Sequence, residues 1–521
     1  MKKILFSAII AAFPFAGSAA LSISQQNAIE DIRHAADMID ATWVACMRGG
    51  DGNLYMADTY DTLSGNLSGP SDVWPYTAAI EAHCSILEAL EAARELDPDL
   101  YGELHDKFTS RLSLLIDNLE YYRGSIILSS YASQRKWQPY AVPRASRKGE
   151  ADVRGILNVY DDQMWLSREL IRAYRLTGNE EWLQTATHLA DYAIDGWDCW
   201  RDENGVEYGG ITWGPGYNSK HACSNSPLIQ PLVWLSEIYS ASDETFKTYF
   251  RDEENQVKSE MRLRSEYYLE FAEKIYNWQK EKLQHSSGVY WDMMGADNKI
   301  ITSRGYRQHV DCGAPTGSFF SYNTGTMLAG AAELYSATGN ADYRDDLTEL
   351  AKVSLNKFSK YVRKHGSYEF TTDDTAANGF NTWFNDVLLR AYVDAEPFAG
   401  NNSAETAIKS FRTNLEYAFE NHNRGNMLPI HLLDGWGNET LTKGFHQYAF
   451  ASEFAMIALW MIQKENVDAS ISLIDGSGNL DSLPDDGMIY TLTGISLGKK
   501  EKVAPTLPHG LYISAGKKII L

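Results

Sequence analysis

The chain has 521 residues and a formal net charge of −22, with 47 Lys and Arg against 69 Asp and Glu. Nucleic acids and anionic membranes bind proteins through clustered positive charge. This charge balance therefore argues against both as partners.

The first twenty residues predict an export signal. Lys2 and Lys3 precede the apolar run 4–15, and the small residues at 16–20 supply a cleavage site. No other stretch reaches the ~18 uninterrupted apolar residues of a membrane span, and no cysteine follows the cleavage site to carry a lipid anchor. We therefore expect residues 1–20 to be a signal peptide. The mature protein should be soluble, without membrane insertion, and periplasmic, cell-surface or extracellular.

Twelve segments carry apolar residues at helical spacing. The expected helices span 25–48, 74–96, 99–122, 161–177, 179–195, 225–241, 257–284, 321–338, 340–364, 379–396, 403–420 and 444–464. The pattern Tyr-x-x-Thr-Gly-Asn-x-x-Trp at 174–182 returns at 335–343 with Tyr in the last position. In both copies the glycine can take the left-handed conformation that ends a helix, and the asparagine can cap the next helix. Each copy therefore predicts the short turn of a helical hairpin.

Six such hairpins can close into a ring, with one helix of each pair inside and the other outside. We therefore expect residues 21–465 to form an all-α (α/α)6 barrel, although an open helical solenoid fits the repeat almost as well. If the tight turns share one face, the long loops lie on the other face, where binding residues tend to collect. The long loops are 123–160, 196–224, 285–320, 365–378 and 421–443.

Residues 466–521 have a different composition, in which Gly, Ser, Asp and Pro punctuate short apolar runs. This pattern predicts a linker and a small C-terminal β module. Gly-Leu-Tyr-Ile at 510–513, followed by Gly-Lys-Lys at 516–518, resembles the C-terminal sorting modules of bacterial type IX secretion.

Asp161 and Asp162 stand side by side where a long loop meets the helix expected over 161–177. Acidic residues are favoured in the first turn of any helix because they complement its macrodipole, so the pair has a purely structural interpretation. Neighbouring carboxylates also raise each other's pKa. Such a pair suits a reaction that needs one acid protonated and its partner ionised, as glycoside hydrolysis does. Its position at the long-loop face favours the catalytic interpretation.

The aromatic content, with 14 Trp and 30 Tyr, also favours a glycan ligand. Exposed rings combine an apolar face with a hydrogen-bonding edge, and sugars present similar mixed faces. Trp213 lies in the glycine-rich stretch 209–217, which lacks the spacing of a phosphate loop. We expect Trp213 to stack on a sugar, and the glycines to let the backbone approach the ligand.

Further candidate binding residues begin two of the inner helices. Lys220, Ser224 and Asn225 lead into the sixth helix, and Tyr322 and Asn323 begin the eighth. Each of them could simply cap or pack its helix, or could direct a polar group toward a bound sugar.

Neither a metal nor another cofactor is expected. The five cysteines include no Cys-x-x-Cys pair, and the histidines show no zinc spacing. In an exported chain five cysteines allow at most two disulfides, and the sequence does not assign their pairing.

Four motifs, in this order, resemble glycoside hydrolase family 76, the endo-α-1,6-mannanases. They are the Asp-Asp pair, Gly-Gly-Ile-x-Trp at 209–213, the segment 220–225 and Tyr-Asn-x-Gly at 322–325. The resemblance implies an (α/α)6 barrel and an endo-acting hydrolase of α-1,6-mannosidic bonds in mannan. It also implies a retaining double displacement, with Asp161 as the nucleophile and Asp162 as the acid/base.

The chain departs from the common family pattern at several positions. These departures leave open which glycosidic linkage the protein cleaves and which decorations of the mannan backbone it accepts. These positions are Thr212, Pro227, Thr324, Asn381 and Trp383.

Two alternatives also stay open. One is a different (α/α)6 glycan enzyme, either an unsaturated glucuronyl hydrolase or a transglycosylase. A glucuronyl hydrolase would hold a substrate carboxylate with Arg or Lys near the catalytic acid. Lys220 is the candidate for that role. The other alternative is an exported glycan-binding protein without catalysis. We expect a monomer whose partner is α-mannan or a manno-oligosaccharide.

Overall fold

The computed structural model describes residues 21–296, 299–370 and 381–475, and four short strands further on, at 488–490, 496–499, 511–514 and 517–520. The expected signal peptide at 1–20 lies outside the described residues.

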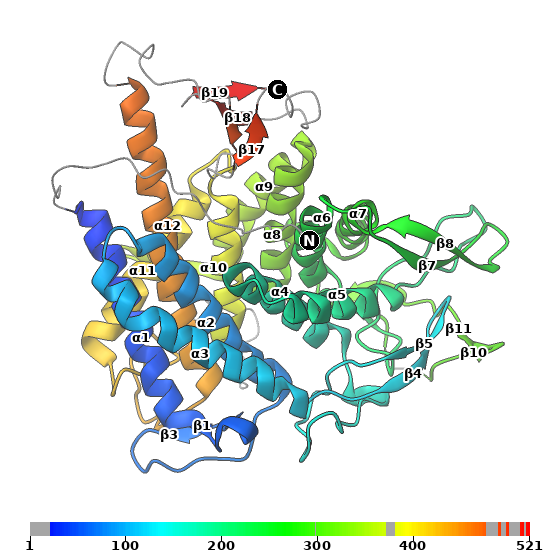
Figure 1. Cartoon of the computed structure of the whole chain (residues 1–521), viewed down its shortest axis with the longest axis horizontal. Coiled ribbons are helices and arrows are strands. Elements are labelled where there is room, and N and C mark those ends of the chain that lie inside the picture. Colours follow the sequence, from blue (N-terminus) through cyan, green and yellow to red (C-terminus); the bar gives the residue numbers. More distant parts are fainter. Residues whose placement is uncertain are drawn as a thin grey trace.

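Twelve α-helices occupy this part of the chain (Figure 1). They are α1 (Ile23–Cys46), α2 (Val73–Ala93), α3 (Pro98–Asn118), α4 (Tyr160–Thr177), α5 (Glu180–Asp195), α6 (Ile229–Tyr239), α7 (Arg264–Leu283), α8 (Ser321–Thr338), α9 (Ala341–Phe358), α10 (Asn381–Ala395), α11 (Ser403–His422) and α12 (Gly444–Asp475).

The even-numbered helices form a closed inner ring. Each contacts the next in chain order, and α12 returns to contact α2. The odd-numbered helices pack outside them, and α1 lies beside α12 (Figure 1). Burial follows this order, since α8 is buried at every position from Ser321 to Ala332, whereas α3 buries one stripe that includes Leu100, Leu104, Phe108 and Leu112. The ring confirms the (α/α)6 barrel and excludes the open solenoid.

The repeated Thr-Gly-Asn turns take the predicted form. Gly178 and Gly339 have φ of 71° and 68°, in the left-handed region that favours glycine. Asn179 and Asn340 then accept hydrogen bonds from the backbone N–H of Glu181 and Asp342, each at 3.0 Å. The two hairpins therefore end and restart their helices by the same local chemistry.

Short antiparallel strands decorate the loops. The two-stranded pairs are β1 (Met47–Arg48) with β2 (Tyr55–Met56), β3 (Tyr60–Asp61) with β15 (Leu441–Thr442), β4 (Ile126–Ser129) with β5 (Gln134–Trp137), β7 (Thr245–Arg251) with β8 (Val257–Leu263), β10 (Thr302–Ser303) with β11 (Tyr306–Arg307), and β13 (Ser359–Val362) with β14 (Ser367–Phe370). A three-stranded sheet has the order β12 (Pro315–Thr316), β9 (Met293–Met294), β6 (Lys220–His221). In the tail, β17 (Ser496–Lys499), β16 (Met488–Tyr490), β18 (Leu511–Ser514) and β19 (Lys517–Ile520) form a four-stranded sheet in that order.

Three expected helix boundaries are wrong. Residues 257–263 form β8 because their alternating pattern pairs with the aromatic and β-branched strand β7. Residues 359–362 likewise form β13, and α12 continues past 466 to Asp475. The β7–β8 hairpin also makes the α6–α7 connection long. Its end reaches the long-loop face, where the Asn255 side chain accepts a hydrogen bond from the Arg201 N–H at 2.8 Å.

Buried ion pairs fill the middle of the inner ring. Arg172 of α4 bonds Glu169 at 2.8 Å and Glu88 of α2 at 2.6 Å, and Arg390 of α10 pairs with Glu81. Because an unpaired charge is costly in such an interior, these pairs fix the inner helices relative to one another.

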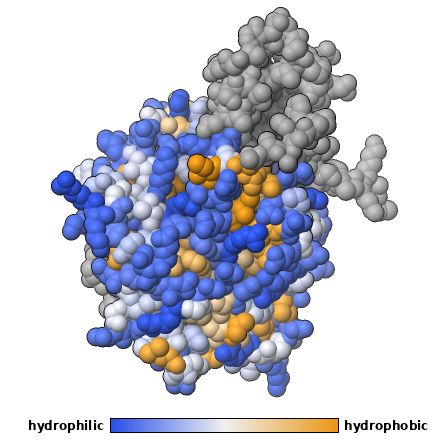
Figure 2. All heavy atoms as spheres, turned by 90° about the vertical axis from the view of Figure 1, so that its left-hand side faces the viewer, coloured by the Kyte–Doolittle hydropathy of each residue, from blue (hydrophilic) through white to orange (hydrophobic). Residues whose placement is uncertain are grey.

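The outer surface is mainly hydrophilic, with separate apolar patches, on the face over α1 (Figure 2). Among the described residues, no helix combines the length and apolar character that a bilayer crossing requires.

Candidate active site

A cavity of about 910 Å³ opens where the long loops meet the N-terminal ends of the inner helices. Its walls come from the α1–α2, α3–α4, α5–α6, α7–α8 and α11–α12 loops and from the first turns of α2, α4, α8, α10 and α12. The lining residues include Asp58, Asp72, Trp74, Asp161, Asp162, Trp165, Trp213, His221, Cys223, Asp292, Tyr322, Trp383, Phe384 and Lys443. The predicted gathering of loops on one face therefore produces a real recess.

The two adjacent aspartates lie on the wall of this cavity, in the first turn of α4. Val159, in extended conformation, precedes the helix. Trp213 approaches from the α5–α6 loop: its backbone oxygen accepts the Tyr160 N–H at 2.8 Å, and its indole N–H lies 3.4 Å from Asp161 Oδ2. The loop thus places an aromatic ring beside the acid pair.

Burial separates the titration of the two acids. It raises the pKa of Asp161 to about 6, although hydrogen bonds from the Cys223 thiol and the Trp213 indole favour its ionised form. Burial, and then the charges of Asp161 and Asp72, raise the pKa of Asp162 well above its ordinary value. Near neutral pH the pair therefore holds one carboxylate and one carboxylic acid.

Cys223 and Tyr322 lie near Asp161 in the cavity wall. The Cys223 thiol acts on the Asp161 carboxylate as a hydrogen-bond donor that lowers its pKa, and the Tyr322 hydroxyl acts on the Cys223 sulfur in the same way. Burial raises the pKa of Cys223 well above its ordinary value, so the thiol stays protonated. No motif in the sequence indicates this contact.

Removing the thiol should therefore shift activity toward higher pH. In Cys223→Ala, Asp161 loses a hydrogen bond that favours its ionised form, so its pKa rises and the acidic limb of the kcat/KM profile moves to higher pH. A bond of about 1 kcal/mol corresponds to about a fivefold lower kcat/KM at pH 5, with little change on the alkaline side of the limb. Cys223→Ser, which keeps a donor, is the matched control. An unshifted limb in Cys223→Ala would contradict the role of the thiol.

The glycines of 209–217 serve packing rather than ligand approach. Gly209 and Gly210 have φ of 70° and 78°, and a Cβ on either would overlap the Trp278 ring of α7. A Cβ on Gly214 would lie 2.5 Å from the backbone oxygen of Asn158. The expectation that these glycines admit a ligand is therefore corrected, since they hold the loop that carries Trp213 against α7 and the start of α4.

Lys220, predicted to bind substrate, is buried outside the cavity lining. Its ammonium lies 2.8 Å from Asp198 Oδ2, and His309 Nδ1 lies 2.7 Å from the same oxygen. Burial would raise the pKa of Asp198, but the charges and hydrogen bonds of these partners hold it below its ordinary value. Lys220 therefore neutralises the buried Asp198 carboxylate, which also connects the α5–α6 loop to His309 of the α7–α8 loop.

Ser224 and Asn225, also predicted to bind substrate, are fully buried and bond the backbone. The Asn225 amide accepts the Ile211 N–H at 2.8 Å and donates to the His221 oxygen at 2.7 Å. The Ser224 hydroxyl donates to the Ile211 oxygen at 3.1 Å. Neither side chain lines the cavity, so their placement supports a structural role, in which they tie the middle of the α5–α6 loop at Ile211 to the end of that loop.

Of the two residues predicted on α8, Tyr322 lines the cavity and Asn323 lies behind it. Asn323 is fully buried and reaches Asp292, a cavity residue that the sequence analysis missed. Asp292 stands in a long loop without a recognisable motif.

Aromatic rings line a further part of the cavity. Trp165 and Trp383 meet edge to face with centroids 4.9 Å apart, and the Trp383 indole donates to Glu81 at 3.0 Å. Trp383, named from sequence as a departure from the family pattern, thus links the cavity to the buried ion pairs below it.

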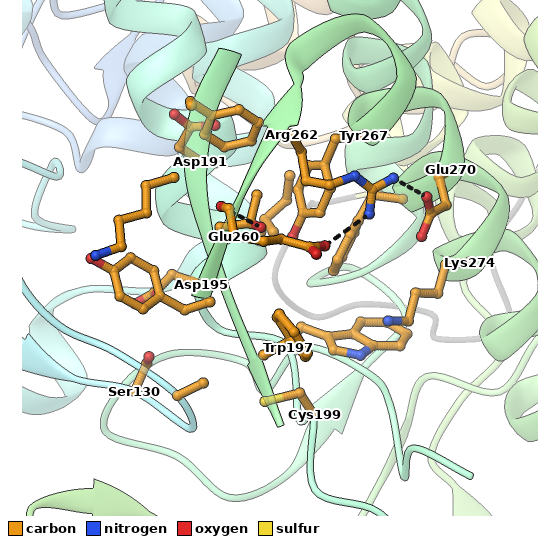
Figure 3. Close-up of a pocket in the computed structure, with 18 of the residues that line it drawn as sticks. Ser130, Asp191, Asp195, Trp197, Cys199, Glu260, Arg262, Tyr267, Glu270 and Lys274 are labelled. Carbon is orange, nitrogen blue, oxygen red and sulfur yellow. Dashed lines mark hydrogen bonds and ion pairs between the residues drawn. The ribbon is translucent and has the colours of Figure 1, made fainter. Parts of the chain in front are cut away.

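A smaller cavity of about 210 Å³ lies elsewhere, between the β7–β8 hairpin, α5 and α7 (Figure 3). Several of its charged side chains are paired with one another: Arg262 bonds Glu260 and Glu270 (Figure 3). Lys274 lies 2.6 Å from Glu207. It contains neither member of the Asp161–Asp162 pair, so the larger cavity is the candidate active site.

A family model described as glycosyl hydrolase family 76 matches residues 150–247 and 261–469, which is more than half of the chain and contains both aspartates. The chain belongs to glycoside hydrolase family 76. This family 76 protein is therefore a glycoside hydrolase, with most of its cavity-lining residues in the matched region.

Among curated proteins, the family 76 chain is similar to the mannan endo-1,6-alpha-mannosidase DFG5 of Saccharomyces cerevisiae. The two are 24% identical over 243 residues, or 45% of this chain and 46% of that protein. The Candida albicans protein of the same name is 23% identical over 202 residues, or 38% of each chain. The chain thus spans less than half the length of these curated relatives.

Solved structures share the fold. The family 76 mannosidase Bt3792 from Bacteroides thetaiotaomicron has a TM-score of 0.59 and 20% identity, covering 84% of this chain and 100% of that one. An inactive variant of an alpha-1,6-mannanase from Salegentibacter, with two consecutive aspartates changed to asparagine and in complex with alpha-1,6-mannotriose, has a TM-score of 0.54 and 19% identity, covering 82% and 99%.

Proposed function

We propose that this protein is an endo-acting hydrolase of α-1,6-mannosidic bonds in mannan backbones. The observation that carries the proposal is the Asp161–Asp162 pair, placed at the start of an inner helix on the wall of the large cavity. Both curated relatives are named for this activity. The Salegentibacter mannanase is described as inactive once two consecutive aspartates are replaced, which supports a catalytic role for the consecutive pair here.

The proposed chemistry is a retaining double displacement. Asp161 attacks the anomeric carbon while Asp162 protonates the departing glycosidic oxygen. Asp162 then takes a proton from water as the water oxygen attacks the anomeric carbon, and the bond between that carbon and Asp161 breaks. The order of the two pKa values supports these roles, because burial leaves Asp161 the more readily ionised acid and Asp162 the proton carrier.

The size and charge of the cavity support a neutral oligosaccharide as substrate. About 910 Å³ lies near the upper end of the ~300–1,000 Å³ typical of ligand pockets, which is room for several sugar units. Among the described lining residues there are five aspartates and one lysine, Lys443, which lies 3.9 Å from Asp58. A glucuronyl hydrolase would need a cationic partner for its substrate carboxylate, so this wall favours mannan.

The test is product analysis on unbranched α-1,6-mannan. We expect manno-oligosaccharides of several lengths from the earliest time points, with the α-anomer of the new reducing end formed first in proton NMR spectra. Dextran, an α-1,6-linked glucan, is the control for the sugar. A folded protein that binds mannan but cuts nothing would be a glycan-binding protein, and a β-anomer formed first would exclude the retaining mechanism.

We further propose that the protein works after export, with residues 1–20 as the signal and the tail as a sorting module. The four-stranded antiparallel sheet β17-β16-β18-β19 in the tail supports a separate β unit. Because α12 reaches Asp475, such a unit would begin after that residue rather than at 466.

A further inference from the structure

Asp292 occupies a fixed position on the cavity wall. It directly precedes β9, and its backbone oxygen accepts the Ala222 N–H at 2.8 Å beside β6. The sheet therefore holds Asp292 next to the segment that carries Cys223, whose thiol lowers the pKa of Asp161. A Cβ on Gly317 would come within 2.8 Å of the Asp292 Cβ, so a glycine at 317 leaves the space that this side chain fills.

The Asp292 carboxylate has unused capacity to accept hydrogen bonds. Its one side-chain hydrogen-bond partner within the described residues is Asn323, whose amide N–H lies at 3.5 Å, the long limit of such a bond. The Asn323 side-chain oxygen is itself buried without a partner in the described structure. Burial raises the pKa of Asp292 to about 6. A half-buried, undersatisfied carboxylate that faces a cavity is stabilised when a ligand brings donors to it.

Asp292 and Asp161 face the same portion of the cavity. Asp161, Asp292, Cys223 and Tyr322 line the same cavity, and the charges of both aspartates act on the thiol and on the tyrosine hydroxyl. A sugar unit bound at Asp161 therefore also faces the Asp292 side chain. Its hydroxyl groups are the donors that the carboxylate lacks.

We propose that Asp292 binds the mannosyl unit at the nucleophile by accepting hydrogen bonds from its hydroxyl groups, with Asn323 as the residue that positions Asp292. This inference rests on the proposed function. It assigns no proton transfer to Asp292, since Asp161 and Asp162 account for the whole reaction.

The experiment measures hydrolysis and binding separately. On α-1,6-mannotetraose, Asp292→Ala and the isosteric Asp292→Asn should lower kcat/KM by about 10–100-fold, the scale of hydrogen bonds to a charged group. In an Asp161→Ala/Asp162→Ala background, where nothing is cut, adding Asp292→Ala should weaken mannotetraose binding at least about tenfold by calorimetry. Asn323→Ala should produce a smaller loss of the same kind.

Asp311→Asn is the matched control, because Asp311 is an exposed aspartate of the same loop outside the cavity lining. Melting temperatures establish that each variant is folded. Hydrolysis and binding within twofold of the parent in Asp292→Asn and Asp292→Ala would overturn the inference. A loss above about 10⁴-fold in kcat with unchanged binding would also overturn it, since that result marks a proton-transferring group. If the wild type neither cuts nor binds mannan, the proposed function itself fails.

Discussion

Asp161→Asn should lower kcat/KM on α-1,6-mannan by about 10³-fold or more, which is roughly 4 kcal/mol of transition-state stabilisation. Asparagine has the shape of aspartate but does not attack the anomeric carbon. The loss should be similar for substrates with good and poor leaving groups, because formation of the covalent intermediate itself fails. Initial rates on mannan and on an aryl α-1,6-mannobioside measure both.

Asp162→Ala is the comparison that separates the two roles. It should lose about as much activity on mannan, because the departing oxygen receives no proton. On an aryl glycoside whose leaving group needs no proton, the first step should survive, so that a burst of phenol precedes slow turnover. Equal losses on both substrates for both variants would contradict the assignment of Asp162 as the acid.

Lys220→Met should reduce the free energy of unfolding by roughly 3–5 kcal/mol, because it leaves the buried Asp198 carboxylate without its lysine partner. His309 remains within 2.7 Å of that carboxylate and holds part of the charge when protonated. Urea denaturation followed by circular dichroism measures the change. KM for mannan should change little in the fraction that stays folded, since Lys220 does not line the cavity.

The double variant Asp198→Asn/Lys220→Met is the control for this prediction. It removes the buried charge together with its partner, so much of the lost stability should return. A raised KM in Lys220→Met with unchanged stability would instead restore the sequence-based expectation of substrate contact.

The helices and turns of the barrel were predicted well because each of them is specified by residues that are close together in the sequence. The Thr-Gly-Asn turns need only a left-handed glycine and a capping asparagine, and both copies behave identically. The acid pair was found for the same reason, since it sits where a loop becomes a helix. The β7–β8 hairpin was missed because seven alternating residues fit a strand as well as a helix, and pairing with the preceding segment 245–251 decides between them.

The site was harder to predict where partners come from separate loops. Lys220 is a structural cation only because Asp198 and His309 meet it from two other segments. Asp292 joins the cavity only through the β6–β9 pairing, and its local sequence shows nothing more than an acid after the buried residues Val289 and Tyr290. No sequence motif encodes such contacts between residues that are far apart in the sequence.

The closure of the inner ring by α12 sets the order in which this chain can mature. Ser85 of α2 and Ser452 of α12 lie 2.9 Å apart across 367 residues, and α1 packs along α12 as well. The first hairpin therefore keeps an uncovered apolar side until nearly the whole barrel has been synthesised. Contacts at such long range form late and slowly. For the export proposed above, this delay keeps the chain unfolded long enough to be threaded through a membrane, and it also makes the chain dependent on factors that prevent aggregation.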